Sequence, residues 1–116
     1  MASPWLPFTD SAQLAALVQE SYQHPVLIFK HSTTCSISAA AKAKLERQWP
    51  DANLPTDTHL YYLDLLRYRA LSGQVASEFG IEHESPQLLL IQDGKCRYHA
   101  SHLGIRLSEA GAALVK

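Results

Sequence analysis

Apolar residues along the chain follow two repeating patterns, one typical of buried strands and one typical of helices with a single apolar face. Short runs rich in apolar residues predict four strands, at residues 26–29, 59–63, 87–91 and 95–100. Apolar residues three or four positions apart predict four helices, at residues 10–22, 37–49, 71–79 and 107–115. A helix separates the first two strands, so we expect them to be parallel with a right-handed crossover. The pattern predicts an α/β fold with a four-stranded mixed sheet between helices.

Turn and cap residues indicate where these elements begin and end. Thr9 can cap the first helix, and Pro50 ends the second because proline cannot continue a helix. Gly80 stands where a left-handed residue would end the third helix. Asp93 and Gly94 are a strong two-residue hairpin signal, so we expect the last two strands to be antiparallel neighbours.

Composition and charge indicate a single globular domain. The 116 residues are 47% hydrophobic, enough for one core, and we expect one domain over residues 1–116. Ten Lys and Arg residues balance eleven Asp and Glu residues, which argues against a nucleic-acid or membrane-binding surface. No apolar run approaches the roughly 20 residues of a membrane span, and the first residues do not resemble a signal peptide. Two cysteines are too few for a secreted disulfide framework, so we expect a cytoplasmic protein.

Candidate chemistry concentrates in the polar stretch from His31 to Ser38, between a predicted strand and a predicted helix. A cysteine at such a turn lies at the positive end of the helix dipole, beside N–H groups without partners inside the helix. This position can lower a thiol pKa from about 8.5 to between roughly 3.5 and 7.5, which would make Cys35 a thiolate nucleophile. A buried structural cysteine is the alternative. The neighbouring hydroxyl residues, Thr34 and Ser36 among them, favour an accessible sulfur.

The second cysteine, Cys96, has a different environment. It alternates with Lys95 and Arg97, which predicts that it faces the core from an edge strand, together with Tyr98 and Ala100. Five residues of strand separate it from the end of the sheet that holds Cys35, on the order of 15 Å, whereas a disulfide needs Cα atoms within roughly 7 Å. We therefore expect Cys96 to pack in the core and not to form a disulfide with Cys35.

Four ordered motifs resemble those of one protein family. The chain reads Phe29-Lys30-His31-Ser32-Thr33-Thr34-Cys35-Ser36-Ile37-Ser38, then Tyr62-Leu63-Asp64, then His83-Glu84-Ser85-Pro86-Gln87, then Tyr98-His99-Ala100-Ser101-His102-Leu103-Gly104-Ile105. The order of elements is similar to the thioredoxin fold, and the motifs resemble the monothiol bacilliredoxin (YtxJ-like) family over nearly the whole chain. The resemblance implies a thioredoxin-like α/β fold and a thiol–disulfide oxidoreductase that removes bacillithiol, a low-molecular-weight thiol, from mixed disulfides on proteins.

The resemblance also implies roles for residues around Cys35, the expected catalytic nucleophile. Ser38 stands where a dithiol thioredoxin has its resolving cysteine. Its hydroxyl either donates a hydrogen bond to the thiolate or is an ordinary polar group of a first helical turn. Pro86 resembles the cis-proline of this fold, while a proline before a strand is equally compatible with a trans bond. The candidates for tuning the thiolate are Ser38, Thr34, His31 and His102, and those for binding substrate are Ser85, Pro86, Ser36, His99 and Gly104.

The candidate histidines each allow more than one interpretation. His99 and His102 lie at the returning end of the hairpin, which is expected to bring them toward Cys35, and His31 precedes Cys35 by four residues. A histidine cation would lower the pKa of the thiol, and a neutral histidine would accept its proton. A surface histidine without a functional role is the alternative for each.

Two positions depart from the pattern of the family. Members are expected to have proline after the cysteine, and Ser36 replaces a residue preset for the first helical position. An aromatic residue is common where Leu103 stands. Ser36 affects the reactivity of the Cys35 thiol, and Leu103 affects the shape of the substrate groove. Neither change removes the nucleophile.

These inferences predict a monothiol oxidoreductase. Cys35 attacks the bacillithiol sulfur of a mixed disulfide, keeps the bacillithiol, and is freed by an external thiol or reductase. We expect no tightly bound cofactor: bacillithiol is a co-substrate, and the partners are bacillithiolated client proteins, not nucleic acid or membranes. Two other functions stay open. One is a metal or iron–sulfur module that uses Cys35, His31, His99 and His102, and the other is a non-catalytic adaptor that holds a peptide beside Ser85 and Pro86.

Overall fold

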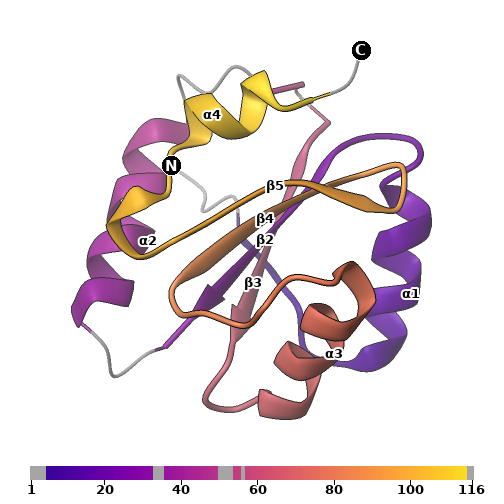
Figure 1. Cartoon of the computed structure of the whole chain (residues 1–116), viewed down its shortest axis with the longest axis horizontal. Coiled ribbons are helices and arrows are strands. Elements are labelled where there is room, and N and C mark those ends of the chain that lie inside the picture. The colour runs from indigo at the N-terminus through magenta and orange to yellow at the C-terminus, as the bar shows by residue number, and fades with distance from the viewer. Residues whose placement is uncertain (1–4, 33–35, 50–53, 56, 115–116) are drawn as a thin grey trace.

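A mixed sheet runs through the centre of the structure, with helices on both sides (Figure 1). This computed structural model describes residues 5–32, 36–49, 54–55 and 57–114. The described residues form five strands: β1 (Trp5–Pro7), β2 (Val26–His31), β3 (His59–Asp64), β4 (Gln87–Gln92) and β5 (Lys95–Ser101). Their helices are α1 (Ser11–Glu20), α2 (Ser36–Gln48), α3 (Arg69–Phe79), the 3-10 turn η2 (His102–Gly104) and α4 (Leu107–Ala112). The predicted α/β architecture is confirmed.

The order of the strands across the sheet is β1-β3-β2-β4-β5. β2 and β3 are parallel, as predicted, with Val26 opposite His59 and His31 opposite Asp64. β4 is antiparallel to both β2 and β5. β2 is therefore an interior strand, and all six of its residues are buried. Burial on both faces explains the continuous apolar run that marks this strand in the sequence.

Apolar clusters on the two faces of the sheet hold the helices in place. Successive residues of a strand point to opposite faces, so the run from Leu88 to Ile91 contributes to both clusters. α1 and α3 cover one face, and α2 and α4 cover the other (Figure 1). The first face includes Val26, Ile28, Leu89 and Ile91, and the second includes Leu27, Phe29, Leu88 and Leu90.

The described sheet has one strand more than predicted, because β1 carries little sequence signal. Trp5 to Pro7 pair in parallel with Leu60 to Tyr62 at the edge of the sheet. Three residues are too few to show a period of two, and proline is unusual in strands away from sheet edges. The predicted four-stranded count is therefore wrong by this edge strand.

Several predicted boundaries also move. α1 is capped by Asp10 and not by Thr9: the Asp10 carboxylate accepts the Gln13 N–H at 3.0 Å, and the Gln13 side chain accepts the Asp10 N–H at 3.2 Å. The helix ends at Glu20, two residues before the predicted end. β2 continues through His31, beyond the predicted end at Phe29. Gly80 closes α3 with φ 66°, as predicted.

A bulge in the last hairpin changes which residues share a face. Leu90 pairs with Tyr98 but Ile91 pairs with Cys96, so the register shifts between these two positions. As a result Cys96 packs with the α1 and α3 side, while Tyr98 and Ala100 pack with the α2 and α4 side. The prediction that these three residues share one face is wrong, because the bulge interrupts the alternation from which it was made.

None of the described helices has both the length and the apolar character needed to cross a bilayer.

Candidate active site

The predicted nucleophile Cys35 and its neighbour Thr34 lie outside the described residues, so the site is built from the residues on either side. β2 ends at His31, and α2 begins at Ser36, the residue after Cys35 in the sequence. The backbone N–H of Ser32 donates to Oγ of Ser38 at 3.0 Å. This bond ties the end of β2 to the first turn of α2, on both sides of the cysteine in the chain.

Ser38 is buried in the first turn of α2, with none of its surface exposed. Its Oγ accepts the Ser32 N–H, and this leaves the hydroxyl hydrogen to act as a donor toward another group. Farther along the same helix, Ala41 and Leu45 pack in the α2 and α4 cluster and fix α2 on the sheet. Ser38 is therefore more than a solvent-facing polar residue, because it satisfies a backbone N–H at the candidate site.

His31 is buried at the end of β2, with 6% of its surface exposed. Its ring centroid lies 5.3 Å from that of Tyr62 and 5.8 Å from that of Phe29. Burial lowers the pKa of His31, and the nearby Lys42 charge lowers it further, while Asp64 and a hydrogen bond with the Ser38 backbone act in the opposite direction. The net effect favours a neutral imidazole. Of the two roles open from the sequence, this environment argues against a histidine cation beside the thiolate.

The Ser85–Pro86 peptide bond is cis, as the family resemblance implies. The Pro86 carbonyl accepts the backbone N–H of His102 at 2.9 Å. His102 has φ 58° and begins η2, which lies against α2. The structure therefore brings His102 beside Pro86 and places η2, which includes Gly104, against α2. Ser36 is exposed at the start of that helix.

His99 lies elsewhere. It pairs with Leu89 on β4, which faces the α1 and α3 side, so the sheet separates it from α2. It is exposed and lines a hollow of about 400 Å³ that also includes Glu82, Glu84 and Ser101. The expectation that the hairpin brings His99 toward the start of α2 is not supported by this register.

Lys30 is a feature that the residue-by-residue prediction missed. Its side chain is fully buried on the α3 side of β2, where Nζ donates to the Ser72 carbonyl at 3.1 Å and lies 3.3 Å from Nδ1 of His83. The Ser72 hydroxyl lies 3.1 Å from the same nitrogen. Burial lowers the pKa of Lys30 to about 8 and, with the Lys30 charge, lowers that of His83. The sequence signal that could have identified this residue is its position, directly after the apolar run of residues 26–29 in a buried strand.

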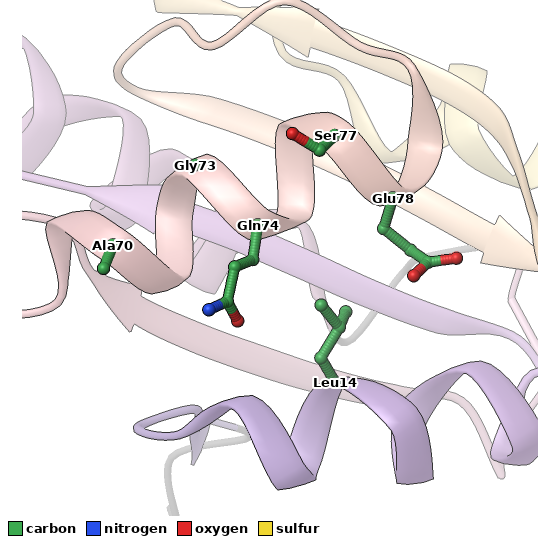
Figure 2. Close-up of a pocket in the computed structure, with 6 residues that line it drawn as sticks. All are labelled: Leu14, Ala70, Gly73, Gln74, Ser77 and Glu78. Carbon is green, nitrogen blue, oxygen red and sulfur yellow. The ribbon is translucent and has the colours of Figure 1, made fainter.

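This cluster connects the strand before Cys35 with the segment before Pro86, since His83 precedes Ser85 by two residues. His83 and Ser72 line a hollow of about 260 Å³ with Leu65, Arg69 and Gly73. A wider hollow of about 720 Å³ lies between α1 and α3 (Figure 2), with Leu14 on one helix and Gln74 on the other. The smaller hollow is lined by the Arg69 guanidinium and the His83 imidazole. It is therefore the better candidate for an extension of the site.

A comparison with protein-family models finds the family described as monothiol bacilliredoxin BrxC, which matches residues 7–110. The chain belongs to the monothiol bacilliredoxin family. The matched span includes Cys35, the cis-proline segment and η2. Membership of this family, together with the fold, makes the chain a thiol oxidoreductase of the thioredoxin type.

Solved structures agree on the fold of this bacilliredoxin. A structure described as a candidate oxidoreductase with a thioredoxin fold is 27% identical, with TM-score 0.79 over 94% of this chain and 92% of the other. Spinach chloroplast thioredoxin f is 13% identical, with TM-score 0.71 over 94% and 85% of the two chains. Thioredoxin O2 from Arabidopsis thaliana is 11% identical, with TM-score 0.68 over 97% and 92%. The two thioredoxins are too distant to show more than a common fold.

Proposed function

We propose that this bacilliredoxin removes bacillithiol, or a similar low-molecular-weight thiol, from mixed disulfides on client proteins in the cytoplasm. The observation that carries the proposal is the family match over residues 7–110, which includes Cys35. Two features of the fold support it: α2 starts at the residue after Cys35, and the cis Ser85–Pro86 bond precedes β4. The helix start supplies backbone N–H groups that favour a thiolate.

The proposed reaction is a thiol–disulfide exchange without net oxidation. The Cys35 thiolate attacks the bacillithiol sulfur, a Cys35–bacillithiol disulfide forms, and the disulfide bond to the client breaks. The client sulfur leaves as a thiolate and takes a proton from solvent. A second thiol, either bacillithiol or an external reductase, then attacks the adduct and restores the Cys35 thiol. Bacillithiol acts as a co-substrate in this scheme, and no resident cofactor takes part.

The surrounding residues have distinct proposed roles. His31 stays neutral and acts as a hydrogen-bonding group, solvent takes the thiol proton, and Ser38 and Thr34 donate hydrogen bonds that favour the thiolate. Ser85 and Pro86 present backbone groups to an extended substrate, and the bond between His102 N–H and the Pro86 carbonyl holds that segment. Ser36 and Gly104, both exposed, border the same region. His99, on the other face of the sheet, is the weakest candidate for substrate contact.

Intact-mass spectrometry of both partners tests the proposal. After incubation with a bacillithiolated client peptide, we expect wild-type protein to gain the mass of one bacillithiol and the peptide to lose it. The Cys35→Ser variant is expected to gain none, because a serine hydroxyl cannot form a disulfide. Cys96→Ser is the matched control and is expected to behave like wild type.

Equal adducts on wild type and Cys35→Ser would refute the assignment of Cys35. Faster transfer from a glutathionylated peptide than from a bacillithiolated one would refute bacillithiol as the preferred thiol.

A further inference from the structure

A second cluster of reactive side chains lies at the other end of the sheet. Glu20 is the last residue of α1, His24 lies in the connection to β2, and His59 is the first residue of β3. His59 pairs with Val26, the first residue of β2, whereas the candidate active site follows the last. Five residue steps along β2, from Val26 to His31, at about 3.3 Å each separate the two ends by about 16 Å. The cluster is therefore independent of the proposed thiol chemistry.

The three side chains converge. Both carboxylate oxygens of Glu20 lie 3.0 Å from Nδ1 of His59, and Nε2 of His24 lies 4.0 Å from one of them. The two imidazole rings meet edge to face, with centroids 4.6 Å apart. One donor atom from each residue lies within 4.8 Å of the other two. Among the described residues, this is the group of three whose positions suit a metal ion, and it contains none of the histidines near the candidate active site.

Tyr61 supports the same carboxylate from behind. Its hydroxyl donates to the two oxygens of Glu20 at 2.9 and 3.2 Å, and its ring packs against Phe8. Partners of this kind orient carboxylate ligands in metal sites. The Glu20 side chain is 18% exposed, that of His24 16% and that of His59 44%, so the cluster is held by the fold yet open on the His59 side.

We propose that Glu20, His24 and His59 bind a divalent transition-metal ion, with zinc as the ion that this donor set suits best. Two imidazoles and one carboxylate are a ligand set that zinc accepts, and water would take the fourth position from the open side. Ligand atoms at about 2.0–2.1 Å from zinc lie roughly 3.4 Å apart in a tetrahedron. The donor atoms here lie within 4.8 Å of one another, so side-chain rotations that move them by about an ångström would complete the site.

Hydrogen bonding explains only part of this arrangement. It accounts for the contacts of Glu20 with His59 and Tyr61, but His24 Nε2 at 4.0 Å is beyond hydrogen-bond distance from the carboxylate. An ion at the centre would bring His24 and Glu20 together and displace the hydrogen bond from His59. It would join the end of α1 to the start of β3 and stabilise the folded state by an amount that rises with the logarithm of the free ion concentration once this exceeds the Kd.

Titration of the full-length Cys35→Ser variant with Co²⁺ and Zn²⁺ tests the site without interference from that thiol. We expect one ion per chain, the visible d–d absorption of tetrahedral Co²⁺ without a thiolate charge-transfer band, and a higher melting temperature with Zn²⁺. His24→Gln and Glu20→Gln, each made in this variant, are expected to weaken Zn²⁺ binding at least about tenfold. Tyr61→Phe keeps the ring and is expected to weaken binding by about tenfold.

Glu78→Gln is the matched control, because Glu78 is an exposed glutamate of α3 outside the cluster. It is expected to bind Zn²⁺ as the Cys35→Ser protein does. His24 lies 4.0 Å from the Glu20 carboxylate, beyond hydrogen-bond distance, so His24→Gln tests ligation with little risk to folding. Unchanged affinity in His24→Gln and Glu20→Gln, or no binding at all to the Cys35→Ser protein, would overturn the proposal.

Discussion

Lys30 shows how one buried residue links the strand before the nucleophile to the segment before the cis-proline. A lysine in an interior strand loses its hydration, and two contacts replace it in part: the Ser72 carbonyl and the His83 ring. Because the ammonium form loses more on burial than the neutral amine, the pKa of Lys30 falls from 10.5 to about 8. Protonation of this residue is therefore coupled to folding.

The coupling predicts a pH dependence with a definite sign. Between about pH 8 and about pH 10.5 the unfolded chain holds the Lys30 proton while the folded chain releases it, so the free energy of unfolding rises with pH. The full contribution of this group is up to about 3 kcal/mol. Urea denaturation of wild type and Lys30→Met at about pH 7.5 and about pH 10 measures it. Only wild type is expected to show this rise, because other titrating groups are common to both proteins. Parallel pH profiles would contradict it.

At the scale of elements, the β4–β5 hairpin depends on its turn and on the end of α1. Asp93 and Gly94 have φ 54° and 74°, the left-handed conformation of a tight two-residue turn. The Asp93 N–H donates to the Ser21 carbonyl and the Gly94 N–H to the Ser21 hydroxyl, both at 2.9 Å. The tip of the hairpin therefore docks on the residues that follow α1.

Gly94→Ala is expected to destabilise the protein by about 1–2 kcal/mol, from the positive φ alone. A Cβ there would also lie 2.7 Å from the Tyr22 hydroxyl, which must move. Gly73→Ala is the contrasting variant, because nothing lies within 4 Å of a Cβ at that position of α3. It is expected to stabilise the helix by roughly 0.5–1 kcal/mol. Thermal or urea unfolding of both variants measures these effects, and equal effects of the two substitutions would contradict the account.

At the scale of the whole molecule, the length of the sheet separates Cys96 from the candidate active site. Cys96 pairs with Ile91, which pairs with Val26, so Cys96 lies level with the start of β2. From there to His31 is five residues, or about 16 Å at about 3.3 Å each. Burial raises the pKa of the Cys96 thiol, and its S–H donates to the Tyr98 carbonyl at 3.3 Å. These features fit a thiol that packs in the core.

This separation predicts that oxidation forms no Cys35–Cys96 disulfide within one chain. After treatment of dilute wild-type protein with a thiol oxidant, non-reducing peptide mapping is expected to find Cys35 in mixed disulfides or intermolecular links, with Cys96 still alkylatable after unfolding. An abundant intramolecular Cys35–Cys96 peptide would contradict the predicted monothiol behaviour.

Local pattern determined much of this architecture. The runs at Val26 and Leu88 and the helical stripes predicted the main elements because an interior strand and an amphipathic helix each require a specific spacing of apolar residues. Asp93-Gly94 and Gly80 marked their turn and cap because few residues adopt a positive φ. The thiol motif before α2 identified the candidate nucleophile and family without any coordinates.

Other features depend on contacts between distant segments, which no local pattern encodes. β1 exists because it pairs with β3, the bulge places Cys96 and Tyr98 on opposite faces, and His99 faces away from α2 through the register of β5. Residues 20, 24 and 59 meet only because α1 ends where β3 begins. Lys30 contacts His83 only because α3 and the segment after it pack on that face of the sheet. The sequence alone determined which elements form and which cysteine is the candidate nucleophile. The tertiary structure decided which side chains share an environment, because burial and proximity arise only when those elements pack.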